Sequence, residues 1–198
     1  MATYEPYDKF YRKAKAMGLP SRAAFKIEEI IARHRMAPKG ARIVDLGCAP
    51  GGWLAILARA VGTGGRVVGV DLAPCRNVSA GAIAIVGDIL NESIAARVAN
   101  ELGGGADLVT SDLAPKLTGI AARDQARSRE LIDAAIEFTA RVLKPGGAMV
   151  AKMFMGEEFK EVIAEFKQRF GEVEVMRTKA SRPGSSELYV IARNFKRR

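Results

Sequence analysis

The sequence predicts an α/β fold, with a doubly wound sheet that is mostly parallel, ends in an antiparallel C-terminal strand and has helices on both faces. Short apolar runs rich in Val and Ile alternate with helical runs from residue 42 onward, which is typical of parallel strands joined by crossover helices. The last two strand-like runs, VEVMRT and ELYVIARNF, are separated only by KASRPGSS, which is too short for a crossover helix. Residues 1–198 are expected to form one domain, with the polar, basic and aromatic residues 1–20 as an arm.

The expected elements follow one another regularly. A helix is predicted over residues 21–36, with Ser21 as its N-cap. Its apolar stripe has helical spacing and consists of Phe25, Ile27, Ile30 and Ile31. Strands are predicted over residues 42–46, 66–72, 82–88, 106–113, 148–154, 173–178 and 187–195. The helices between them are predicted over residues 53–62, 91–102, 128–143 and 157–170, with a Pro-Gly turn at residues 144–147.

The charge balance indicates an anionic partner. Lys and Arg number 31 against 22 Asp and Glu, so the formal charge is +9, which favours nucleic acid or an anionic membrane surface, although charge for solubility explains it equally well. The two cysteines form no CxxC pair and there is one histidine, so no metal site is expected. Two isolated thiols, no N-terminal apolar segment and no run long enough to span a membrane predict a cytoplasmic protein without a membrane partner.

A glycine-rich turn, VDLGCAPGGW at residues 44–53, joins a strand to a helix. Glycines and a helix N-terminus let the backbone approach a ligand closely, while a plain strand–helix turn is the structural alternative. The spacing fits neither G-x-G-x-x-G nor the P-loop. The dinucleotide-binding reading, and with it a nicotinamide oxidoreductase, is therefore disfavoured.

Acidic residues stand at the ends of four predicted strands, where open α/β sheets bind ligands. Asp71 is placed to accept hydrogen bonds from ribose hydroxyls and Asp88 from an adenine amino group. Asp45 and Asp112 would favour a cationic ligand, while an acidic rim would repel a pyrophosphate. S-adenosylmethionine has the ribose, the adenine and the positive charge, so it is the predicted cofactor.

Five stretches of the chain stand out together: SRAAFKIEE, VDLGCAPGGW, SDLAP, VAKMF and SSELYVIA. In their order, and over nearly the whole chain, they resemble the RrmJ/FtsJ ribosomal RNA 2′-O-methyltransferases. The resemblance implies a Rossmann-like methyltransferase sheet and S-adenosylmethionine as cofactor. It also implies a catalytic tetrad of Lys26, Asp112, Lys152 and Glu187, with Lys152 as the base that takes the proton of a ribose 2′-hydroxyl. The cofactor contacts that it implies are Gly51, Trp53, Asp71, Asp88 and Asp112.

The residues themselves support these roles unequally. Lys152 stands in an apolar strand, where a lysine is costly unless it is paired; the alternative is a lysine that reaches solvent from the strand end. Lys26 could equally be a solvated helix charge, and Glu187 an acid at a turn end. Because free lysine is protonated at neutral pH, Lys152 could orient the hydroxyl and stabilise its negative charge instead of acting as a base.

The resemblance implies a uridine of 23S rRNA in the large ribosomal subunit as target. The protein is expected to be a monomer that binds no DNA. The alternatives are a tRNA 2′-O-methyltransferase and an inactive fold that binds RNA during ribosome assembly. Basic and aromatic residues alternate in the arm, where they could contact phosphates and bases or simply form a solvated face. The candidates there are Tyr4, Tyr7, Lys9, Phe10, Tyr11, Arg12, Lys13, Lys15 and Arg22, joined by Arg123, Arg127, Arg129 and the tail Lys196, Arg197 and Arg198. One departure from the family pattern is Lys116, in the loop after Asp112.

Overall fold

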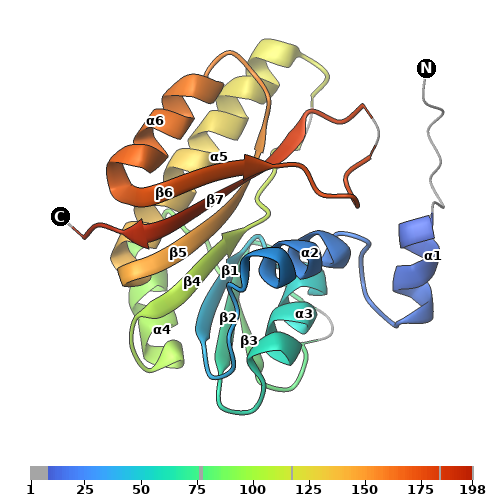
Figure 1. The fold of residues 1–198 in the computed structure, drawn as a ribbon, viewed down its shortest axis with the longest axis vertical. Helices are drawn as coiled ribbons and strands as arrows, with labels where there is room; N and C mark the ends of the chain where they lie inside the picture. The colour runs from blue at the N-terminus through green and yellow to red at the C-terminus, as the bar shows by residue number, and fades with distance from the viewer. Residues whose placement is uncertain (1–8, 76–77, 117, 183, 198) are drawn as a thin grey trace.

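A computed structural model describes residues 9–75, 78–116, 118–182 and 184–197. Seven strands form one sheet in the order β3-β2-β1-β4-β5-β7-β6 (Figure 1). Neighbouring strands from β3 to β5 pair in parallel, and β7 pairs antiparallel with both β5 and β6. The predicted fold class is therefore confirmed. The strands are β1 (Arg42–Leu46), β2 (Arg66–Asp71), β3 (Ala82–Val86), β4 (Ala106–Ser111), β5 (Leu143–Phe154), β6 (Phe170–Met176) and β7 (Glu187–Phe195).

Helices cover both faces of the sheet (Figure 1). They are α1 (Lys9–Ala16), α2 (Ala24–His34), α3 (Gly52–Val61), α4 (Glu92–Leu102), α5 (Ala121–Val142) and α6 (Phe159–Arg169). The apolar side chains of α4, α5 and α6 pack in one core with Val44, while those of α2 and α3 pack in a second core with Ile43. Adjacent residues of β1 thus serve opposite cores because side chains alternate along a strand. No described helix is both long and apolar enough to cross a bilayer.

The direction of β7 positions the site. The parallel strands β1, β4 and β5 end at one edge of the sheet, and Phe154 at the end of β5 pairs with Glu187 at the start of β7. A residue that opens an antiparallel strand therefore lies at the edge where the parallel strands end. The apolar sequence of these central strands follows from their burial on both faces.

The N-terminal segment differs from the prediction in two respects. Helix α2 begins at Ala24, and its N-cap residue Ala23 makes no side-chain cap bond. The prediction of Ser21 as N-cap is wrong, because the Ser21 hydroxyl accepts from the Ala23 N–H in a turn that precedes the helix. Within the expected arm, α1 is a helix whose Ala14 is buried with Phe25 and with Ala180 from the far end of the chain. Tyr4 and Tyr7 lie outside the described residues.

The bounds of two elements in the second half of the chain also differ from the prediction. Helix α5 begins at Ala121 instead of residue 128, after a loop in which the Asp124 carboxylate accepts hydrogen bonds from the N–H groups of Thr118 and Gly119. The predicted Pro-Gly turn at residues 144–147 lies inside β5, where the register with β4 shifts. The reason is that the irregular start of a strand accommodates a proline and glycines that a regular ladder would not.

Candidate active site

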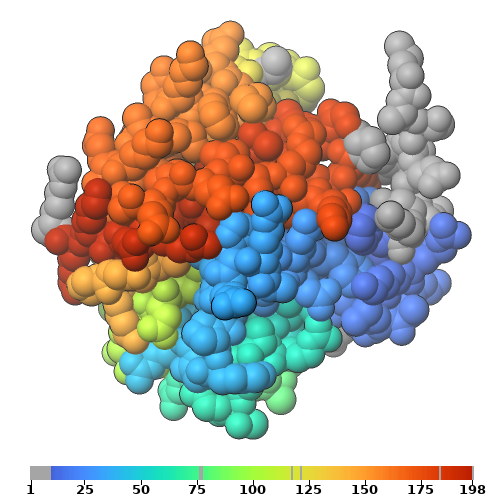
Figure 2. All heavy atoms as spheres, viewed as in Figure 1, coloured from blue at the N-terminus to red at the C-terminus, as the bar shows by residue number. Residues whose placement is uncertain are grey.

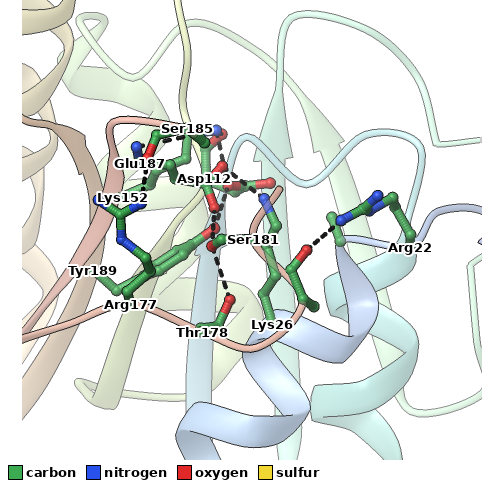
Figure 3. Close-up of polar contacts among 12 residues, drawn as sticks. Arg22, Lys26, Asp112, Lys152, Arg177, Thr178, Ser181, Ser185, Glu187 and Tyr189 are labelled. Atoms are coloured by element: carbon green, nitrogen blue, oxygen red, sulfur yellow. Dashed lines mark hydrogen bonds and ion pairs between the residues drawn. The ribbon is translucent and has the colours of Figure 1, made fainter. Parts of the chain in front are cut away.

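Two ion pairs lie side by side at the sheet edge (Figure 3). The Lys152 ammonium is 2.8 Å from the Asp112 carboxylate and donates to the Asp112 carbonyl at 2.7 Å. The Lys26 ammonium is 2.7 Å from the Glu187 carboxylate. The side chains are 8% to 19% exposed, so all four are largely withdrawn from water but still reachable. The fold thus gathers the predicted tetrad from α2, the end of β4, β5 and β7.

Tyr189 is a fifth member of this cluster that the sequence analysis missed. Its hydroxyl lies 3.4 Å from the Asp112 carboxylate, and its ring lies 5.9 Å from the Lys26 ammonium. Burial raises the pKa of the Tyr189 phenol, and the Asp112 and Glu187 carboxylates raise it further, so the group stays a neutral donor. The available signal was the strand period of two, which places Tyr189 on the same face of β7 as Glu187.

The Glu187 carboxylate is held ionised by its partners. Burial raises its pKa, but the hydrogen bond and charge of Lys26 and the hydroxyl of Ser181 lower it more, so the net direction is downward. The Ser181 hydroxyl donates to the second carboxylate oxygen at 2.8 Å and contacts Thr178 at 3.0 Å. The loop between β6 and β7 therefore fixes Glu187 from one side, while α2 fixes it from the other.

The glycine-rich turn packs directly against the loop after β4. Gly47 has φ 77°, and a Cβ there would lie 3.1 Å from both the side chain and the backbone nitrogen of Leu113. A larger residue is therefore disfavoured both by the backbone conformation and by the lack of space. Gly51 has φ 110° and occupies the N-cap position of α3. A cavity of about 70 Å³ opens here, with Asp112 in its wall. Its lining consists of Ser21, Ala23, Gly47, Cys48, Ala49, Pro50, Gly52, Trp53 and Asp112.

Asp71, the predicted ribose ligand, is the last residue of β2, and Asp88, the predicted adenine ligand, lies two residues beyond the end of β3. One Asp71 oxygen accepts from the Ala49 N–H of the glycine turn at 2.9 Å, and the other accepts from Ala73 at 2.9 Å. Asp88 accepts from the Leu90 N–H at 3.0 Å. Each carboxylate oxygen can accept a second hydrogen bond, so both side chains keep capacity for a ligand while they order their own loops.

The two thiols, which form no CxxC pair in the sequence, contact each other beside this region. The Cys48 sulfur in the turn is 3.4 Å from the Cys75 sulfur in the loop after β2, and both thiols are free. Burial raises the pKa of each. They therefore pack as protonated thiols between the turn and the loop.

Trp53, a predicted cofactor contact, also joins two helices. Its side chain is 3% exposed, its indole N–H donates to the Ala23 carbonyl at 2.8 Å, and its ring lies 5.9 Å from that of Tyr189. The indole thus connects α3, the start of α2 and the ion-pair cluster.

Trp53→Phe is expected to lower the free energy of unfolding by about 1 kcal/mol, because the Ala23 carbonyl loses its donor. The position of α2, and with it Lys26, should become less fixed. Chemical denaturation monitored by far-ultraviolet circular dichroism measures the effect. An unfolding midpoint equal to that of the wild type would contradict this role.

Asp45 is a fully buried carboxyl group beneath the site. The Thr110 hydroxyl donates to one oxygen at 2.7 Å, whereas the other oxygen has no partner among the described residues. Burial raises the pKa of Asp45 to about 8, and the Asp112 and Asp71 charges contribute. The contribution of the Asp112 and Asp71 charges to this pKa indicates a negative potential at this end of the sheet, which suits a cationic ligand.

Asp45→Asn is expected to change how stability depends on pH. A carboxyl group with a pKa near 3.8 when unfolded and about 8 when folded contributes stability that is fully present below the unfolded pKa and is lost as pH rises towards 8. The wild type should therefore lose on the order of a few kcal/mol between pH 5 and pH 8.5 relative to the variant. Urea unfolding across this range tests it; parallel curves for the two proteins would refute it.

Comparison with solved structures shows the same fold. A crystal structure of a Plasmodium falciparum protein, described as a ribosomal RNA methyltransferase, superposes with a TM-score of 0.78 at 24% identity and covers 88% of this chain and 97% of its own. A Clostridium thermocellum structure, described as an rRNA-methylase, gives a TM-score of 0.58 at 20% identity. The fold and the site together define a Rossmann-like methyltransferase.

The chain belongs to the FtsJ-like methyltransferase family, whose model matches residues 19–195. An Anaeromyxobacter protein is 47% identical over 98% of this chain and 71% of its own length. A Methanoculleus marisnigri protein is 47% identical over 96% of this chain and 92% of its own length. Both are named Ribosomal RNA large subunit methyltransferase E.

Proposed function

We propose that the protein transfers a methyl group from S-adenosylmethionine to the 2′-hydroxyl of a uridine in the ribosomal RNA of the large subunit, acting as a cytoplasmic monomer. The observation that carries the proposal is the pair of buried lysine–carboxylate contacts, Lys152–Asp112 and Lys26–Glu187, beside the glycine turn. The names of the similar proteins support the choice of ribosomal RNA.

The glycine turn and its acids fit S-adenosylmethionine. The donor carries a positive sulfonium and a positive ammonium, and the negative charges of Asp71 and Asp112, which help to raise the pKa of Asp45, favour such a ligand. Gly47 lets the turn pack closely against the backbone of Leu113, and Gly47 and Asp112 both line the cavity at the turn. When bound, the donor supplies an electrophilic methyl group. We assign its binding to Gly51, Trp53, Asp71, Asp88 and Asp112.

Lys152 is the residue that we assign to the 2′-oxygen. Its nitrogen directs two N–H groups at the carboxylate and carbonyl of Asp112. A neutral amine has two N–H groups and one lone pair, so with both N–H groups on Asp112 the lone pair can accept the proton of the 2′-hydroxyl. The methyl–sulfur bond of the donor would break as the oxygen–methyl bond forms, and the neutral thioether would leave. The Lys26–Glu187 pair and Tyr189 hold Asp112 and the substrate side of the site in place. Holding the hydroxyl in attack geometry supplies much of the rate.

The surface beside the tetrad suits the RNA backbone. Figure 2 shows α2 lying against the segment between β6 and β7, and the Glu29 carboxylate accepts from the Lys179 N–H at 2.8 Å. Arg22 donates to the Ala180 carbonyl and lies over the Phe10 ring, so it anchors α1 and α2 as well as adding charge. The exposed cations on this surface are Arg12, Lys13, Lys15, Arg177 and Lys179. We propose that they contact phosphates.

Transfer of labelled methyl from S-adenosylmethionine tests the proposal. The acceptors are large ribosomal subunits that lack the modification and, in parallel, tRNA, followed by nucleoside analysis. 2′-O-methyluridine found only in the large-subunit RNA is the expected result. Label in tRNA would move the activity to that substrate, and no label in either, with cofactor binding intact, would favour an RNA-binding role without catalysis.

A further inference from the structure

A second, larger cavity of about 470 Å³ opens beside Lys152. It shares no lining residue with the 70 Å³ cavity at the glycine turn. Lys152 lines the larger cavity and Asp112 lines the smaller one, so the two cavities meet at this ion pair. A site that must bring two substrates together at one lysine needs such an arrangement, and the large cavity has the volume typical of small-ligand sites.

The lining of the large cavity disfavours a phosphate. Its two cations are both neutralised: Lys152 by Asp112, and Arg129 by Asp133 and Glu165. Three carboxyl groups also line it, from Asp124, Glu157 and Glu158. Much of the remaining wall is apolar, formed by Leu113, Ile132, Phe154, Met155, Phe159 and Val162. A neutral, flat group is the ligand that such a wall accepts.

We propose that this cavity receives the nucleobase of the target nucleotide, turned out of its RNA stack, while the ribose 2′-oxygen lies at Lys152. The inference rests on the proposed function and adds the substrate's binding site to it. Enzymes that do chemistry on a base extrude the nucleotide into a pocket and read the base edge by hydrogen bonds, and a ribose that enters the site as far as Lys152 brings its own base to the adjoining cavity. Gln125, on α5 at the cavity, carries an amide that both donates and accepts, so we assign the edge of the base to it. Met155 is 52% exposed in the cavity lining, where it can cover the ring.

Two substitutions in the lining of the large cavity, one that fills space and one that adds a charge, test the assignment. Ser128→Trp places an indole on the α5 wall, and Met155→Asp places a carboxylate at a half-exposed position of the lining. Ile83→Ala, at an exposed aliphatic residue of β3, is the control. Both cavity variants are expected to lower kcat/KM for large-subunit RNA at least about tenfold, with the KM for S-adenosylmethionine unchanged and thermal midpoints like that of the control.

The outcomes separate the two proposals. If wild-type protein methylates the RNA and both cavity variants match Ile83→Ala, the base does not bind here, and the proposed function stands. If the variants raise the KM for S-adenosylmethionine instead, the cavity belongs to the donor and the assignment is overturned. If the wild type methylates no RNA at all, the proposed function fails and this inference fails with it.

Discussion

Lys152→Met is expected to reduce methyl transfer by about 10²–10⁴-fold, while S-adenosylmethionine still binds. The substitution keeps the length and apolar stem of the side chain but removes the only amine in contact with Asp112 among the described residues. The acceptors that remain in the cluster, the Asp112 and Glu187 carboxylates, are much weaker bases than an amine. Single-turnover transfer to large-subunit RNA measures the rate, and titration calorimetry measures binding of the donor.

Lys144→Met is a matched control. Lys144 forms a 2.8 Å ion pair with Asp107, at the opposite end of the sheet and about 40% exposed on each side, so its loss should leave transfer unchanged. Lys152→Arg separates a base from a positive charge, because arginine keeps its proton. We expect the Arg variant to be as inactive as the Met variant. Substantial activity in Lys152→Arg would show that the charge orients the hydroxyl and that the proton leaves by another route.

The second large effect is expected at the Lys26–Glu187 pair. Lys26→Met and Glu187→Gln should each lower kcat/KM by about 10–100-fold, equivalent to about 1.4–2.7 kcal/mol. In each variant the remaining member of the pair loses the contact that holds it in position. The double variant should be little worse than the worse single variant, since contacting residues that act as a unit are not additive. A double variant whose loss equals the product of the single losses would contradict the coupling.

The stability of these variants has its own signature. Glu187→Gln leaves the largely buried Lys26 ammonium without a carboxylate, at a cost of about 1–3 kcal/mol. Because the pKa of Glu187 is lowered in the folded state, the stability it contributes is present above its unfolded pKa and is lost as pH falls through the folded value. The difference from wild type should therefore shrink in acid. Glu28→Gln, which breaks the exposed pair between Glu28 on α2 and Arg59 on α3, is the control and should change little.

Much of the architecture followed from local sequence. The bounds of β1 and β7 match the predicted runs, and helix α4 begins one residue after the start of the predicted run, because Asn91 accepts from the Ser93 N–H as its N-cap. The errors lie where a boundary depends on neighbours instead. Helix α5 begins early because Asp124 organises the loop before it, and the turn at residues 144–147 is part of β5 because β4 pairs with its start.

For the site, the sequence by itself determined which chemical groups are available: a glycine turn between β1 and α3, acids at the ends of parallel strands, and a lysine in an apolar strand. The alternation of side chains along a strand and the end of the strand at which a residue stands are local properties, so a sequence shows them directly. Only the tertiary structure decided the pairing of Lys26 with Glu187, 161 residues apart, the closure of Tyr189 over Asp112 and the cavity beside Lys152. These depend on β7 running antiparallel between β5 and β6 and on α2 packing beside them, and contact between distant segments is set by the packing of the whole sheet.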